Sequence, residues 1–129
     1  MPSTIHSITF DCAEPVQLAH FWAAALGYTV GEWDEEDGEF AEVLPPEGQV
    51  GHHTRLLFVT VPEGKAAKNR LHLDLRPDER SASEVERLVA LGARKIREYD
   101  VPHGHWTLMH DPEGNEFCLA RGAADTSAS

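Results

Sequence analysis

The 129-residue chain has the length of one ordinary domain, and its content of 41% hydrophobic residues is enough to build a core. Its formal net charge of -11 repels phosphate backbones and anionic lipid headgroups, so we expect neither a nucleic acid nor a membrane surface as a partner. No stretch approaches the ~20 apolar residues that a membrane-spanning helix needs. The first ten residues lack the features of a signal peptide, which predicts a cytoplasmic protein.

The first half of the chain predicts a strand, a helix and three further strands. Residues 5–12 alternate between apolar and polar side chains, as a strand with one covered face does. Pro15 opens an apolar stripe at helical spacing, and Gly27 is a residue type common at a helix C-terminus. Three segments rich in strand-forming residues follow, at 28–33, 39–44 and 55–61.

The second half repeats this order. Residues 71–76 alternate again, and Ser81 or Ser83 is expected to cap a helix that ends at Gly92. The apolar stripe of this helix is predicted to be Val85, Leu88, Val89 and Leu91. Three more strands are predicted in the segment that follows, at 93–98, 105–110 and 115–121. The last residues, 122–129, are small and polar, and we expect them to be a disordered tail.

The two halves are related by a constant offset. The helices end in Leu-Gly pairs whose leucines, Leu26 and Leu91, lie 65 residues apart, and the strands fall in phase at the same offset. We therefore predict one domain over residues 1–121, with module one at 4–62 and module two at 69–121. The expected fold is α+β, with two βαβββ modules that form curved mixed sheets around a pocket.

One face of each first strand is polar. Leucines at 71, 73 and 75 suit the face that a helix covers, whereas the alternate residues are polar in both modules. These polar residues are Ser7, Thr9, Asp11, His72, Asp74 and Arg76. Two such faces curving toward each other would line a cavity. The alternative is that both face solvent on half-exposed sheets.

Three strings in the chain have the character of a known superfamily. They are Ala23–Tyr28 at the first helix end, Lys68–Leu75 in the fifth strand region, and Asp111–Leu119 at the turn into the last strand. With the element order, they resemble the glyoxalase/bleomycin-resistance/dioxygenase (vicinal oxygen chelate) superfamily, nearest its glyoxalase-like domain group, over about residues 4–121. The resemblance implies a pocket for a small molecule and domains that often pair as homodimers.

Enzymes of that superfamily commonly hold one divalent metal ion with four side chains. The matching positions here are Ser7, His72 and Cys118, with Glu116 as an outside candidate. The fourth ligand should come from residues 55–61, which contain no His, Asp, Glu, Gln or Cys. At best His72 and Cys118 remain as ligands, with Glu116 as the outside candidate. Because two protein ligands rarely hold a catalytic ion, we expect no metal and no other cofactor, and a divalent metal is the alternative.

The resemblance and the missing ligands lead to three functional hypotheses. The first is a metal-free small-molecule-binding protein of the bleomycin-resistance kind. The second is an enzyme, either a metal-dependent lyase/isomerase or dioxygenase, or an acid–base catalyst using His72 and Glu116. The third is a homodimer with an interaction role. Predicted ligand-binding residues are Ser7, Thr9, His72, Asp74, Trp106, Glu116 and Cys118.

Several of these residues have a plain structural alternative. Trp106 could stack on a flat ligand or fill the core, and Cys118 could be a reactive thiol or a small apolar filler. The pairs His52-His53 and His103-x-His105 resemble metal ligands, but they lie in or beside loops, so we interpret them as surface features.

Overall fold

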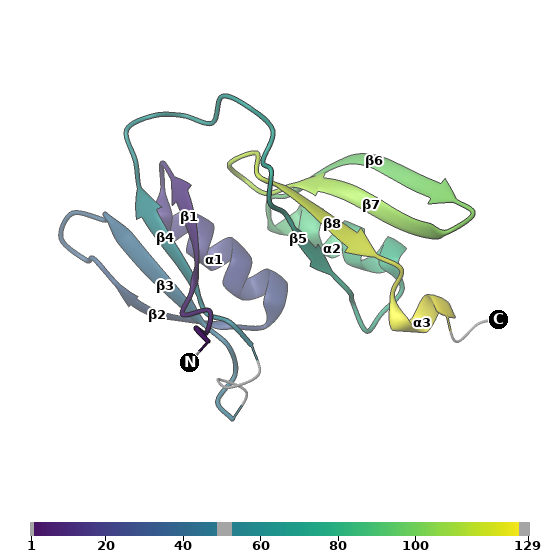
Figure 1. Cartoon of the computed structure of the whole chain (residues 1–129), viewed down its shortest axis with the longest axis horizontal. Coiled ribbons are helices and arrows are strands. Elements are labelled where there is room, and N and C mark those ends of the chain that lie inside the picture. The colour runs from purple at the N-terminus through teal and green to yellow at the C-terminus, as the bar shows by residue number, and fades with distance from the viewer. Residues whose placement is uncertain (1, 49–52, 127–129) are drawn as a thin grey trace. The chain divides into compact units, whose positions relative to one another are not determined.

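The computed structural model describes residues 2–48 and 53–126, which fall into two compact units divided between Gly64 and Lys65. Each unit repeats the order strand, helix, three strands (Figure 1). The first unit contains β1 Ile8–Cys12, α1 Pro15–Leu26, β2 Thr29–Trp33, β3 Phe40–Leu44 and β4 Leu56–Thr60. The second contains β5 Leu73–Leu75, α2 Ser81–Leu91, β6 Arg94–Val101, β7 Gly104–His110, β8 Glu116–Ala120 and α3 Ala123–Thr126.

The two sheets have the same topology. The strand orders are β1-β4-β3-β2 and β5-β8-β7-β6, and in each sheet the first pair is parallel and the others are antiparallel. The predicted α+β fold of two βαβββ modules is therefore confirmed. The helices α1 and α2 also end where predicted, at Gly27 and Gly92, whose φ angles of 69° and 122° suit a residue without a side chain.

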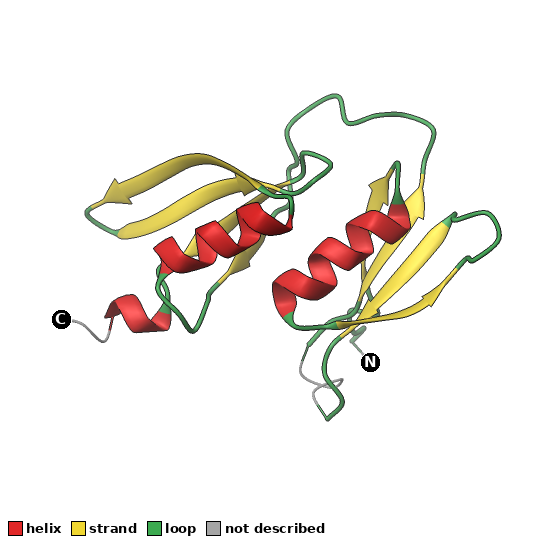
Figure 2. Cartoon of the chain, turned by 180° about the vertical axis from the view of Figure 1, so that it is seen from behind, coloured by secondary structure: helices red, strands yellow, loops and turns green. Residues whose placement is uncertain are grey.

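The helices α1 and α2 each cover one face of their own sheet (Figure 2). In the first unit, Trp22 of α1 is 1% exposed and its ring lies 5.5 Å from that of Phe10 on β1. Phe10 stacks in turn on Phe58 of β4, at 4.9 Å between ring centroids. Burying aromatic side chains of this size stabilises the unit by several kcal/mol, at about 2–3 kcal/mol for each ring.

The second unit has a smaller core. Leu88 is the one residue of α2 that is fully buried, and it is accompanied by Met109 of β7 and by Phe117 and Leu119 of β8. Val89, which the predicted apolar stripe of this helix includes, is 46% exposed. The helix thus contacts its sheet along a narrower stripe than the sequence pattern predicts.

A tight turn delivers the chain into β8. The buried carboxylate of Asp111 accepts hydrogen bonds of 2.9 Å from the backbone N–H groups of Glu113 and Asn115. The side-chain amide of Asn115 donates to the same carboxylate at 3.0 Å. Gly114 takes the left-handed conformation, with φ 85°, that the turn requires. This turn therefore fixes where β8 begins and which of its side chains face away from α2.

The C-terminal segment differs from the expected disordered tail. Residues 123–126 form α3, and Asp125 accepts hydrogen bonds from the backbone N–H of Ser81 at 2.8 Å and of Gly122 at 3.0 Å. The prediction that a serine side chain caps α2 is therefore wrong. The N-terminus of this helix is capped by the carboxylate of Asp125, which lies 44 residues after Ser81 in the sequence. Residues 127–129 lie outside the described residues, as does His52.

Candidate functional site

The open face of the second sheet carries the residues that could perform chemistry. Parallel pairing places Asp74 of β5 beside Cys118 of β8, and antiparallel pairing places Leu108 of β7 on the other side of Cys118. The alternate residues, Phe117 and Met109, are buried on the α2 side. Asp74 and Cys118 therefore face away from the helix, in one row across the sheet.

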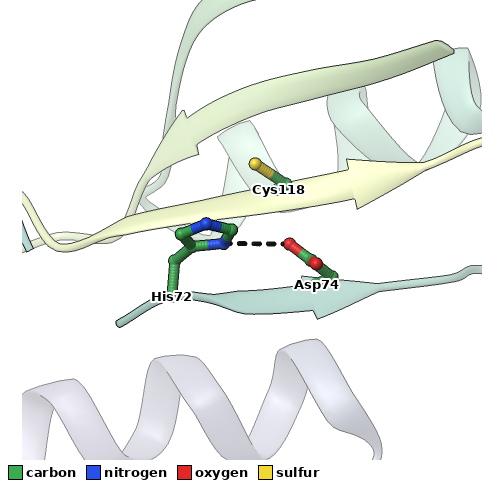
Figure 3. A group of neighbouring side chains, drawn as sticks. All are labelled: His72, Asp74 and Cys118. Atoms are coloured by element: carbon green, nitrogen blue, oxygen red, sulfur yellow. Dashed lines mark hydrogen bonds and ion pairs between the residues drawn. The ribbon is translucent and has the colours of Figure 1, made fainter. Parts of the chain in front are cut away.

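Three donor side chains converge on this face. One ligand atom each of His72, Asp74 and Cys118 can be chosen so that all three lie within 4.8 Å of one another (Figure 3). Nδ1 of His72 lies 3.0 Å from Oδ1 of Asp74, which orients the imidazole ring. His72 and Asp74 are exposed and Cys118 is half-buried, so the group is open to solvent from one side.

The surroundings of the Cys118 thiol favour its protonated form. Burial raises the pKa of Cys118, and the charge of Asp74 raises it further, whereas Lys68 works in the opposite direction. A divalent cation would reverse this balance, because a thiol that coordinates a metal ion is held as the thiolate.

Glu116 lies outside this group. Its carboxylate, which is only 9% exposed, accepts a hydrogen bond of 2.8 Å from the backbone N–H of Asn69 and pairs with Nζ of Lys65 at 3.0 Å. Burial alone would raise the pKa of Glu116, but these two partners outweigh it and hold the pKa at about 2. A carboxylate that is so strongly held in its ionised form is a weak proton acceptor at neutral pH.

Trp106 shares the open face with Cys118, because its register partner is Ala120, two residues beyond Cys118. Its ring stacks on that of Tyr99 at 5.1 Å between centroids, and the guanidinium of Arg97 lies over Tyr99 at 4.6 Å. Trp106 is half-buried here and is not part of the core beneath α2.

The remaining predicted residues, Ser7 and Thr9, belong to the first unit. Thr9 is exposed on the face of β1 that points away from α1, and its partner in β4 is Leu57. The structure thus brings together His72, Asp74 and Cys118, leaves Glu116 and Trp106 nearby with other partners, and places Ser7 and Thr9 in the first unit.

Asp74 is the donor that the metal argument from sequence missed. The sequence predicts one metal ligand from each contributing strand, and His72 is the ligand predicted from the fifth. Residues two apart on a strand share a face, however, and the parallel register sets Asp74 directly beside Cys118. Asp74 stood in the sequence as a ligand-binding candidate, and the alternation of residues 71–76 was the indication that could have added it to the metal donors.

Comparisons with known proteins identify the family of the chain. Residues 7–120 match the family model described as a glyoxalase-like domain. The chain belongs to the glyoxalase-like domain family. A search of curated proteins found no match. As a member of this family, the chain has the fold of the glyoxalase/bleomycin-resistance/dioxygenase superfamily, as the sequence predicted.

Solved structures share the fold of this glyoxalase-like chain at low sequence identity. A mutant of the fosfomycin resistance protein FosX from Listeria monocytogenes, complexed with Mn(II) and 1S,2S-dihydroxypropylphosphonic acid, is 15% identical, with a TM-score of 0.71 over 96% of this chain and 92% of that chain. A glyoxalase-related enzyme from Fulvimarina pelagi is 19% identical, with a TM-score of 0.66 over 92% and 88%. A superfamily enzyme from Burkholderia phytofirmans is 18% identical, with a TM-score of 0.66 over 91% and 96%.

The expectation of a protein without a cofactor is corrected by two findings. A structural neighbour holds Mn(II), and His72, Asp74 and Cys118 offer three converging donors rather than the two counted from sequence. Nitrogen, oxygen and sulfur donors at this separation fit one divalent ion. No helix among the described residues has both the length and the apolar character to cross a bilayer.

Proposed function

We propose that this glyoxalase-like domain binds one divalent metal ion through His72, Asp74 and Cys118 and holds a small organic molecule on the open face of its second sheet. The observation that carries the proposal is the convergence of the three donor atoms within 4.8 Å. The Mn(II) ion and the phosphonic acid in the FosX complex support it as an analogy from a distant structural neighbour.

The three side chains divide the work by their chemistry. The carboxylate of Asp74 orients the imidazole of His72 through Nδ1 and would offer an oxygen to the ion, and Cys118 would supply a sulfur donor from the neighbouring strand. Three protein ligands leave a coordination position for water or for an oxygen of the ligand molecule. A metal ion held by three protein ligands would act as a Lewis acid that polarises the oxygen bound at its open position. This is the chemistry expected of a metal-dependent lyase, isomerase or dioxygenase.

The donor set also predicts which metal ions bind best. Thiolate and imidazole ligands favour Zn²⁺, Co²⁺ and Fe²⁺, whereas Mg²⁺ and Mn²⁺ favour carboxylate, carbonyl and water oxygens. Since Cys118 and His72 supply two of the three donors, we expect zinc or cobalt to bind more tightly than manganese.

The rest of the ligand-binding face is assigned from its position. Trp106 lies on the same face as Cys118 and offers an aromatic surface for a flat ligand. Ser7 and Thr9 stay predicted ligand contacts, which single alanine variants would test. The hydrogen bonds of Glu116 favour a structural role for that residue over the acid–base role predicted from sequence.

Elemental analysis of protein purified without chelator tests the proposal. We expect an equimolar amount of a transition metal, and we expect it to be lost in His72→Ala and in Cys118→Ser. The matched control is His20→Ala, since His20 is an exposed histidine on α1 of the first unit. A protein that takes up no metal, or a His72→Ala variant that retains it, would contradict the proposed site.

The predicted homodimer and the predicted cytoplasmic location are part of the same proposal. The edge strands β2 and β6 each leave one side of their backbone unpaired within their sheets, which offers a surface for a second copy. Light scattering on the purified chain measures the solution mass. A mass equal to one chain at micromolar concentration would exclude the dimer.

A further inference from the structure

A second feature of the second unit is a pocket at one end of its sheet. Its volume is about 520 Å³. It lies where β5 and β8 end and where the hairpin between β6 and β7 turns, and it is lined by Arg76, Ala120, Arg121 and residues 100–105.

Two arginines give the pocket its chemistry. Arg76 follows the last residue of β5 and Arg121 follows the last residue of β8, and these strands are parallel neighbours. Both side chains are exposed, and within residues 2–48 and 53–126 neither makes a hydrogen bond or an ion pair. Two guanidinium groups at one pocket therefore keep their N–H donors available for a ligand.

The hairpin adds two imidazoles and one carboxylate. His103 and His105 line the pocket, and Nδ1 of His105 lies 4.0 Å from Oδ1 of Asp100, which also lines it. With both histidines neutral, the two arginines still outnumber the one acidic side chain. The local charge of the pocket is thus positive in a chain whose net charge is -11.

The distribution of charge along the chain strengthens this contrast. Residues 1–64 contain 11 acidic residues and one basic residue, Arg55, whereas residues 65–129 contain 11 acidic and 10 basic residues. The second unit is therefore close to neutral, and the field of its pocket is not overwhelmed by surrounding carboxylates. An anion would be repelled by the first unit and attracted to this pocket.

We propose that Arg76 and Arg121 bind the anionic group, a carboxylate or a phosphate, of the small molecule that the domain takes up. Arg76 lies two residues beyond Asp74, and Ala120 lies two residues beyond Cys118. Two residues of strand span roughly 7 Å, so one small molecule can reach from the pocket to the His72, Asp74 and Cys118 group. The anion-binding step stands on the pocket alone, and the link to those three donors rests on the proposed function.

Titration of the full-length protein followed by amide NMR tests the anion site. The probes are inorganic phosphate and sodium acetate, with sodium chloride at equal ionic strength as the reference, and both metal-loaded and chelator-treated protein are measured. We expect saturable shifts confined to the amides of residues 100, 101, 103–105, 120 and 121 and to the Nε–H groups of Arg76 and Arg121. Tighter binding of phosphate would identify the anionic group as tetrahedral, and tighter binding of acetate would identify it as a planar carboxylate.

Variants assign the site to its arginines. Arg76→Ala and Arg121→Ala are each expected to weaken binding about tenfold, as the loss of one charge-assisted hydrogen-bonding group does. Arg121→Lys should fall between, because lysine keeps the charge but loses the planar fork. The matched control, Arg94→Ala, removes an exposed arginine of β6 outside the pocket and should bind like the unaltered chain.

The possible failures are distinguishable. Absence of saturable shifts in both protein forms, or unchanged binding in both alanine variants, would overturn the anion site even if elemental analysis finds an equimolar metal. Conversely, saturable phosphate or acetate binding in a protein that takes up no metal would support the anion site and contradict the proposed metal site.

Discussion

Nζ of Lys65 lies 3.0 Å from Oε1 of Glu116, and the other oxygen of that carboxylate accepts a hydrogen bond of 2.8 Å from the backbone N–H of Asn69. These contacts join the segment that enters the second unit to the first residue of β8. Because the same strand carries Cys118 two residues later, Glu116 positions the donor group without being part of it.

Glu116→Gln is expected to destabilise the protein by about 2 kcal/mol, since it replaces a nearly buried carboxylate that holds a charged partner. Chemical denaturation at neutral pH measures the loss. Glu113→Gln is the control, because its side chain lies in the same turn region and is more exposed. Equal stability of the two variants would show that the Lys65 and Asn69 contacts contribute little.

The stability contribution of Glu116 should also depend on pH. Its pKa in the folded protein is about 2, below the ordinary value of 4.5, so the unfolded chain binds the proton more readily. The stabilisation is therefore complete above about pH 4.5 and is lost as the pH falls toward 2. Denaturation midpoints between neutral and acid pH should fall more steeply for the unaltered chain than for Glu116→Gln. Parallel curves would contradict the assignment.

Cys118 is expected to react slowly with iodoacetamide in chelator-treated protein, because burial and then the charge of Asp74 raise its pKa. Asp74→Asn removes that charge and should speed alkylation several-fold at neutral pH, whereas Asp100→Asn, outside this neighbourhood, should not. Mass spectrometry of the Cys118 peptide gives the rate. A slower reaction in Asp74→Asn would be the opposite of the expected sign.

Cobalt loading gives an optical test of the sulfur donor. Co²⁺ bound through Cys118 should produce a thiolate-to-metal charge-transfer absorption in the near ultraviolet and raise the melting temperature, and both effects should be reversed by chelator. Cys118→Ser should lose the absorption, and Cys12→Ser should keep it, because Cys12 is buried in the first unit. An absorption that persists in Cys118→Ser would place cobalt elsewhere.

Gly122 is predicted to be sensitive to the smallest substitution. A Cβ atom at this position would lie 1.9 Å from the backbone oxygen of Glu79. Gly122→Ala must therefore displace the backbone near residue 122, and this segment holds Asp125 against the backbone N–H of Ser81 at the start of α2. We expect a loss of about 1–3 kcal/mol in thermal or chemical denaturation. Gly64→Ala is the matched control, because no atom lies within 4 Å of the added Cβ.

The fold was predictable from the sequence because its evidence is local and repeated. Alternating residues gave the strands, the Leu-Gly pairs gave both helix ends, and the offset of 65 gave the duplication. Helix capping was not predictable in the same way, because the carboxylate that bonds to Ser81 comes from Asp125, and nothing close to Ser81 in the sequence indicates that contact.

The candidate site was predictable only in part. His72 and Cys118 followed from the resemblance, but the role of Asp74 as their neighbour depends on the register between β5 and β8. The partners of Glu116 could not be predicted either, because they come from a connecting segment whose path no periodic pattern specifies. Sequence reasoning therefore identified the residue types on the open face better than the distances between them.

The shortness of β5 has a thermodynamic consequence. Only Leu73–Leu75 pair with β8, so few backbone hydrogen bonds keep this edge strand attached, yet two of the three donors come from it or directly precede it. A metal ion bound by His72, Asp74 and Cys118 would link β5 to β8, two segments that are far apart along the chain. Metal binding should therefore make β5 more ordered. We expect the backbone amides near residue 73 to exchange with deuterium more slowly in the presence of zinc than after its removal.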